Sequence, residues 1–197
     1  MSPRAGLTVD RITQAAAELA DEVGFDNITV AALARKFGVK DASLYSHIRN
    51  LEDLRTRVAM LAADEKTSRI AAAVAGRAGR DALAAFADEW RAYALAHPGR
   101  YAATQMPMDP STAADWTGGR RAIDLTYGML RAYGLDEPDI TDAVRLLRST
   151  FHGYATLEAS GGFGHSRPPT ASWNRIVDAL HTTLTHWPST DEKAKTQ

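Results

Sequence analysis

The segment from residue 28 to residue 54 constrains the fold of this chain more than any other stretch. Its first part carries apolar residues at i, i+3, i+4 and i+7, namely Val30, Leu33, Ala34 and Phe37. Thr29 is a good N-cap for that helix, and Gly38 can end it because glycine adopts the left-handed conformation at little cost. The segment therefore predicts a short helix that ends in a tight turn.

A second short helix is expected after the turn, with Asp41 as a candidate cap. Leu44 and Ile48 are four residues apart and should face inward. The residues expected to face outward are small or polar: Lys40, Ala42, Ser43, Tyr45, Ser46 and His47. Asn50 then caps a third helix, with Asp53 at its N3 position. This pattern is typical of a helix-turn-helix reader of DNA.

An ordinary helical corner with a solvated face would show the same spacing, and helix-turn-helix geometry also occurs in proteins that do not bind DNA. The chain has 23 Lys and Arg against 24 Asp and Glu, so a basic footprint would have to be local. Such a footprint would come from Arg35, Lys36, Lys40 and Arg49.

Residues 8 to about 60 resemble the N-terminal DNA-binding domain of the TetR family of bacterial regulators. The resemblance rests on Gly24-Phe25, Thr29-Val30, Ala34 with Phe37-Gly38-Val39, Leu44-Tyr45-Ser46-His47-Ile48 and Asn50-Leu51-Glu52-Asp53-Leu54. The family usually has Phe where Ile48 stands. It often has Lys, commonly a phosphate contact, where Leu51 stands, and Arg49 is the candidate to replace that contact.

The resemblance implies a homodimer that binds a palindromic double-stranded DNA operator, most simply as a repressor. It implies phosphate contacts from Thr29, Lys40 and Tyr45, with Arg49 as a further candidate. It implies contacts to base edges from Ala42, Ser43, Ser46 and His47.

The whole chain is predicted to be all-α, because alanine is abundant and strand-like alternation is absent. We expect a helix-turn-helix domain over 1–53, joined by a long helix to a ligand-binding and dimerisation domain over 54–188. Residues 189–197 form a polar tail that is expected to be disordered. Residues 1–7 are also expected to be disordered, with Arg4 as an alternative basic arm.

The two last predicted helices carry wide apolar stripes. Residues 151–158 (FHGYATLE) also resemble the His-Gly and Leu-Glu signature of ligand-binding TetR C-terminal domains. Eight residues are predicted to form a dimer interface: Phe151, Tyr154, Leu157, Trp173, Val177, Leu180, Leu184 and Trp187. The alternative is that both helices are simply core.

A set of aromatic residues and methionines is predicted to line an effector pocket: Trp90, Tyr93, Tyr101, Met106, Met108, Trp116, Tyr127 and His152. Flat and flexible side chains of this kind suit a small apolar or aromatic effector. The same spacing is typical of core residues, and His152 could instead cap a buried carbonyl.

The sequence lacks the patterns that catalysis or metal binding would need. It has no cysteine, no H-E-x-x-H, no E-x-x-H and no glycine-rich phosphate loop before a helix. We therefore expect no enzyme activity, no cofactor and no metal.

No run of 18 apolar residues and no signal peptide are visible, so we expect a cytoplasmic protein without a membrane partner. A protein-interaction module and a helical enzyme with an unrecognised site remain as alternatives.

Overall fold

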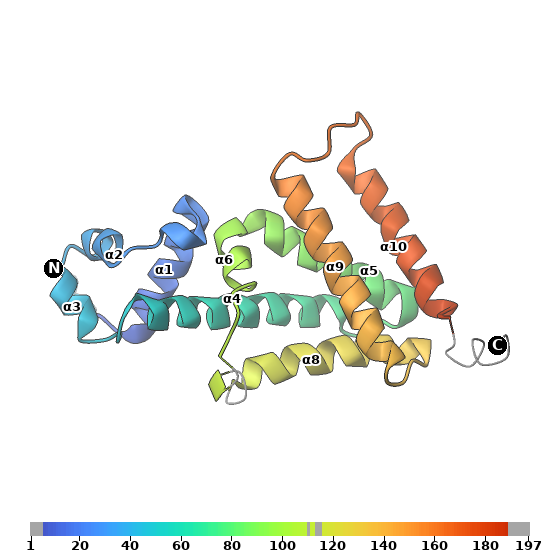
Figure 1. Ribbon diagram of the computed structural model, residues 1–197, viewed down its shortest axis with the longest axis horizontal. Helices are drawn as coiled ribbons and strands as arrows, with labels where there is room; N and C mark the ends of the chain where they lie inside the picture. The colour runs from blue at the N-terminus through green and yellow to red at the C-terminus, as the bar shows by residue number, and fades with distance from the viewer. Residues whose placement is uncertain (1–5, 110, 113–115, 189–197) are drawn as a thin grey trace, which may run out of the picture. The chain divides into compact units, whose positions relative to one another are not determined.

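The computed structural model describes residues 6–109, 111–112 and 116–188 (Figure 1). These residues form helices and connecting turns and contain no strand, which confirms the all-α prediction. The helices are α1 (Val9–Val23), α2 (Val30–Phe37), α3 (Asp41–Tyr45), α4 (Leu51–Val74), α5 (Gly79–Ala96), α6 (Pro98–Ala103), α8 (Thr117–Leu130), α9 (Asp139–Ala159) and α10 (Pro169–Thr185). Short 3₁₀ turns follow α1 at Phe25–Asn27 and α8 at Arg131–Tyr133. The expected arm residue Arg4 and the expected tail 189–197 lie outside the described residues.

The chain divides into two compact units. The N-terminal unit contains Met1–Arg69 and Ala92–Ala122, and the C-terminal unit contains Ile70–Arg91 and Ile123–Gln197. The helices α4, α5 and α8 each contribute residues to both units. The boundary predicted between residues 53 and 54 divides the chain by expected function and stays a prediction.

The N-terminal unit is built around α1. Thr8 caps this helix by accepting a hydrogen bond from the backbone N–H of Arg11. The consecutive residues Ala15, Ala16 and Ala17 are all buried, so α1 is packed on more than one side. Fully buried Ile12, Ile28, Leu33, Leu44 and Leu54 fill the space between α1, α2, α3 and the start of α4. This core fixes the positions of α2 and α3 relative to α1.

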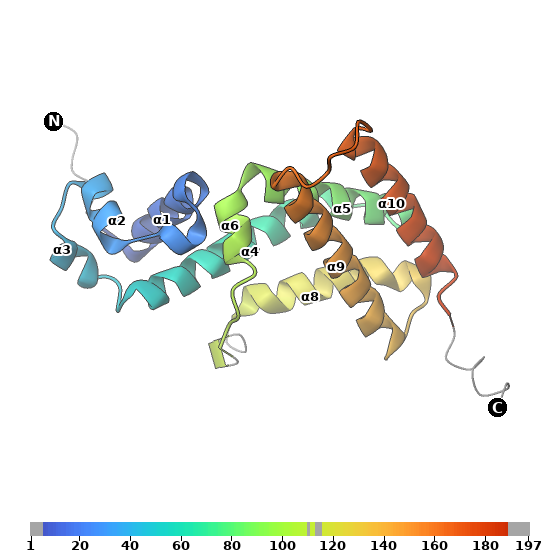
Figure 2. The ribbon, with the colours of Figure 1, turned by 45° about the horizontal axis from the view of Figure 1, so that its top comes forward.

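A cluster of charged side chains also joins α1 to α6 and α4. The Asp21 carboxylate accepts a hydrogen bond of 2.8 Å from the backbone N–H of Arg100 and lies 3.1 Å from His97 Nδ1. The Arg100 guanidinium also donates to Glu65 over 3.1 Å, and the Tyr93 hydroxyl donates to the same carboxylate. Burial, together with the Glu65 charge, raises the pKa of Tyr93 well above its usual value. Figures 1 and 2 both show α6 beside α1.

The C-terminal unit packs α9 and α10 together with the first part of α5. Helices α9 and α10 lie side by side in Figure 2. Its core contains a run of aromatic rings in which Phe151 lies 5.6 Å from Trp173 and 5.9 Å from Trp90, measured between ring centroids. Polar bonds also join the helices: Trp173 Nε1 donates to Asp88 over 2.7 Å, and Arg91 Nε donates to Glu158 over 2.6 Å.

Candidate nucleic-acid interface

The first helix of the predicted reader, α2, begins and ends where the sequence indicates. The Thr29 hydroxyl accepts a hydrogen bond of 3.2 Å from the backbone N–H of Ala32. Gly38 takes the left-handed conformation with φ of 65°, and the N–H of Val39 reaches back to the carbonyl of Ala34. The cap and the glycine turn therefore both form as predicted.

The second helix, α3, differs in detail from the prediction. Lys40, not Asp41, occupies the N-cap position, and no side chain caps this helix. Asp41 is the first helical residue, where its negative charge complements the positive end of the helix dipole. The prediction that Asp41 is the cap was therefore wrong. Only Asp41–Tyr45 are helical, and Ser46 and His47 follow in a turn.

Two apolar anchors orient α3. Leu44 is fully buried and Ile48 is 3% exposed, as expected from their spacing. The residues between and before them face solvent, including Lys40, Ala42, Ser43, Tyr45 and Ser46, and Tyr45 is 52% exposed. Thr29 and Arg49 are exposed as well, whereas His47 is half-buried. The structure therefore brings the eight predicted DNA contacts into one unit, with His47 the least accessible.

The hydroxyl groups of this surface differ in what they can still bind. Ser46 donates its proton to the carbonyl of Ser43 over 2.8 Å, so its oxygen is left chiefly as an acceptor. Thr29 accepts from Ala32, so its proton remains available for an acceptor such as a phosphate oxygen. Because of these hydrogen bonds to the backbone, Ser46 can serve DNA mainly as an acceptor and Thr29 as a donor.

The basic residues near the reader do not all belong to one footprint. Lys36 Nζ lies 3.2 Å from Glu18 and 3.6 Å from Glu22, both on α1. The bond from Lys36 lowers the pKa of the Glu18 carboxyl. Because its charge is balanced by two carboxylates, Lys36 is a weaker candidate for a phosphate contact than the exposed Lys40 or Arg49.

The start of α4 contains a small hydrogen-bond network, of which the sequence predicts only the cap. Asn50 Oδ1 accepts from the backbone N–H of Asp53 over 2.8 Å, as predicted for a cap. Asp53 Oδ2 accepts from the backbone N–H of Arg49 and from Arg57 Nε, each over 3.2 Å. Burial raises the pKa of Asp53, but these bonds outweigh it and the pKa is lowered. The i,i+4 spacing of an acid and a base was the available signal for Arg57.

Two parts of the chain match known protein families. Residues 12–58 match the family described as bacterial regulatory proteins, tetR family, and residues 83–180 match the tetracyclin repressor-like C-terminal domain. An uncharacterized HTH-type transcriptional regulator of Mycobacterium tuberculosis is 37% identical over 161 residues, which cover 80% of this chain and 72% of that protein. This chain belongs to the TetR family. It is a DNA-binding transcriptional regulator and not an enzyme, as its family and this relative indicate.

Solved TetR-family structures share the fold at lower identity. A substitution variant of TetR from Acinetobacter baumannii AYE, in complex with minocycline, has a TM-score of 0.70 and 20% identity and covers 94% of this chain and 100% of that chain. BioQ with its double-stranded DNA operator has a TM-score of 0.63 and 20% identity and covers 91% and 99% of the two chains.

The predicted effector residues of this TetR-family chain fall in both units. Tyr93, Tyr101, Met106, Met108 and Trp116 belong to the N-terminal unit, and Trp90, Tyr127 and His152 belong to the C-terminal unit. Tyr93 and Tyr101 are buried in the core, and Trp116 Nε1 donates to Asp64 over 3.4 Å. The Tyr127 hydroxyl donates to Glu137 over 3.2 Å. The role of this set in binding an effector stays a prediction.

The residues predicted to form the dimer interface differ in their exposure. Six of them are buried within their own chain: Phe151, Tyr154, Trp173, Val177, Leu180 and Leu184. These six residues also belong to the C-terminal core, where they pack α9 and α10. Their role in a dimer interface stays a prediction. Trp187 is half-buried, and Leu157 is 49% exposed. Leu157 is thus the most accessible residue of the predicted set.

Two other features are absent from the described residues. No group of three or more His, Cys, Asp and Glu is placed to hold a metal ion within 6–109, 111–112 and 116–188. In the same ranges, no helix has both the length and the apolar character that crossing a bilayer requires.

Proposed function

We propose that this chain is a repressor that binds a palindromic operator as a homodimer and is released by a small apolar or aromatic effector. The observation that carries the proposal is the surface of α3 and its flanks. Lys40, Ser43 and Tyr45 are exposed there, and buried Leu44 and Ile48 hold the helix in place. Small and polar side chains on a rigid helix let the backbone approach base edges in the major groove.

Within this proposal, Thr29, Lys40, Tyr45 and Arg49 contact phosphates. The free proton of Thr29, the ammonium of Lys40 and the exposed hydroxyl of Tyr45 are suitable donors. Ala42, Ser43, Ser46 and His47 face base edges. The Ser46 oxygen, having donated its own proton to Ser43, would accept from a base amino group.

The experiment that tests operator binding is fluorescence anisotropy with DNA from the upstream region of the protein's own gene. It is run at two salt concentrations with random DNA as the control. Selective binding that weakens with salt is the expected result, because phosphate contacts release counterions. Should that DNA bind no better than random DNA, a genome-wide selection of bound fragments follows. The absence of any selected sequence there would contradict the proposal.

Dimerisation would place two readers on half-sites about 34–36 Å apart. Leu157→Glu is the suitable test because Leu157 is exposed, whereas charges at buried Leu180 or Leu184 would unfold the unit. We expect Leu157→Glu to give monomers in sedimentation velocity. Ile123→Glu is the matched control, since Ile123 is 58% exposed on α8 of the same unit. An unchanged dimer in Leu157→Glu would remove Leu157 from the interface.

Release by an effector is supported by the match of residues 83–180 to a repressor-like C-terminal domain and by the minocycline complex of a protein with this fold. An effector can shift DNA binding only if it binds the DNA-bound and released conformations with different affinity. A compound that raises the melting temperature and lowers operator affinity is the expected finding. Trp116→Ala should remove both effects if Trp116 lines the pocket.

A further inference from the structure

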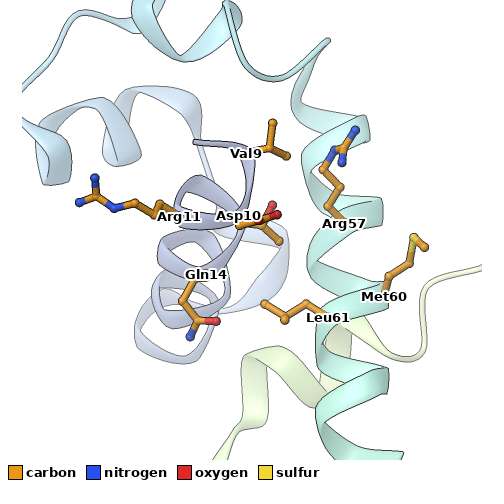
Figure 3. Close-up of a pocket in the computed structure, with 8 residues that line it drawn as sticks. Val9, Asp10, Arg11, Gln14, Arg57, Met60 and Leu61 are labelled. Carbon is orange, nitrogen blue, oxygen red and sulfur yellow. The ribbon is translucent and has the colours of Figure 1, made fainter. Parts of the chain in front are cut away.

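A groove lies between α1 and α4, within the N-terminal unit and outside the set predicted to bind an effector. Its volume is about 510 Å³. It is lined by Val9, Asp10, Arg11, Thr13 and Gln14 of α1 and by Arg57, Met60 and Leu61 of α4. Figure 3 shows Leu61 and Arg57 on the side of α4 that faces α1, with Val9, Asp10 and Gln14 opposite them. Pockets of about 300–1,000 Å³ are typical for small-molecule ligands.

The lining has an apolar part and a charged end. Val9, Met60 and Leu61 are only half-buried, and all three are among the residues that line the groove. Burying a side chain of this type fully is worth about 1.5–3 kcal/mol. An apolar ring laid over these three residues would therefore gain from covering them.

Arg57 provides the charge. Its Nε donates to Asp53, and the part of the chain that the structure describes offers its two terminal nitrogens no hydrogen-bond partner. Those nitrogens carry N–H groups in the planar geometry that matches a carboxylate. Arg57 can thus hold an anion without giving up its bond to Asp53.

Among the charged groups that line the groove, Arg57 is the one best placed to bind an anion. Asp53 already accepts two hydrogen bonds, from Arg49 and Arg57. Arg11 Nη1 donates to the carbonyl of Gly6. Asp10 is exposed at the first turn of α1, where water screens its charge.

We propose that this groove is a binding site for a small aromatic carboxylate, with its ring on Val9, Met60 and Leu61 and its carboxylate on Arg57. The site shares no residue with the effector set proposed above and does not depend on DNA binding. Its ligand joins α1 to α4, the two helices that enclose the core supporting α2 and α3.

The test uses the full chain labelled with ¹³C in its methionine methyl groups and observed by NMR. Met60 reports on the groove, and Met129, buried in the C-terminal unit, reports on ligand bound elsewhere. Met60→Leu assigns the Met60 signal. The probes are 2-naphthoate and its uncharged analogue 2-naphthamide. We expect 2-naphthoate to shift Met60 saturably and to leave Met129 unchanged. We expect 2-naphthamide to bind at least about tenfold more weakly, because it cannot form the charge-assisted pair.

Arg57→Gln should weaken 2-naphthoate at least about tenfold and leave 2-naphthamide unchanged. Arg35→Gln is the control, since Arg35 is exposed on α2 and is not part of the lining. Equal affinities of the two probes for the unmodified protein would overturn the proposal without relying on any variant. A Met60 signal that does not move at millimolar 2-naphthoate would overturn it as well.

Discussion

Gly99 of α6 packs directly against the main-chain carbonyl of Ala20 in α1. A Cβ built on Gly99 would overlap Ala20 O and C and the amide nitrogen of Asp21. All three are main-chain atoms, so none can rotate away. The next residue, Arg100, donates its backbone N–H to Asp21 over 2.8 Å. The start of α6 is therefore held against the end of α1 by a close contact and a charge-assisted hydrogen bond.

Gly99→Ala should destabilise the protein. One added methyl group must push α6 away from α1, and overpacking of this kind typically costs about 1–3 kcal/mol. In a chain of this length the melting temperature should fall by roughly 2–10 °C. Circular dichroism at a fixed protein concentration measures it, because association would make the melting temperature depend on concentration.

Gly128→Ala is the control for that substitution. Gly128 lies in α8, and a Cβ there meets no atom within 4 Å. Alanine is a better helix former than glycine by up to about 1 kcal/mol, so this variant should be as stable as the original or more so. Equal melting temperatures for Gly99→Ala and the original protein would show that α6 can move away at no cost.

Arg100→Met should also destabilise the N-terminal unit. It leaves Asp21 and Glu65 without their shared cation while keeping an unbranched side chain that can fill the apolar part of the space. The Arg100 side chain is only 13% exposed, so the remaining carboxylates are poorly solvated and the cost should be about 1–3 kcal/mol. Arg145→Met is the matched control, because the Arg145 side chain, paired with Asp142, is 75% exposed. Such exposed pairs contribute less than about 1 kcal/mol. Urea unfolding compares the two, and similar losses would contradict a special role for Arg100.

The sequence predicted best those features that depend on neighbours in the chain. The caps at Thr29 and Asn50 and the turn at Gly38 use residues within a few positions of one another, and all three formed as expected. The inward positions of Leu44 and Ile48 also follow from spacing along one helix. The prediction that Asp41 caps α3 was wrong because the helix begins at Asp41 itself, one residue earlier than a cap at Asp41 would require.

Long-range pairings were not predictable in this way. The bond between Asp21 and Arg100 joins residues 79 positions apart, and no local pattern marks it. The stripe through Trp173 and Leu184 correctly indicated a face that must be covered, but periodicity does not say whether the chain itself or a partner covers it. The structure shows that the chain's own helices do so.

The bonds to Asp53 predict a pH dependence of stability. The pKa of Asp53 is lowered in the folded protein, so its contribution is fully present above the pKa of an unfolded aspartate, about 3.9. This contribution is lost as the pH falls through the lower folded value. Asp53→Asn should therefore be less stable than the original protein near neutral pH, and the difference should shrink in acid. Urea unfolding at about pH 7 and about pH 3 measures both differences. A difference independent of pH would mean that the charge of Asp53 does not stabilise the fold.

Lys36 and Lys40 should differ in their effect on DNA binding, although they are four residues apart and both are exposed. Lys36 is balanced by Glu18 and Glu22, so removing it should leave the salt dependence of binding nearly unchanged. Lys40 stands at the start of α3, and each phosphate contact that Lys40→Ala removes should lower the slope of log K against log salt by about 0.9. Anisotropy titrations of Lys36→Ala and Lys40→Ala at several salt concentrations give both slopes. If both variants lose the same amount, Lys36 exchanges its carboxylates for a phosphate when DNA binds, and the ion pair on α1 belongs to the free protein alone.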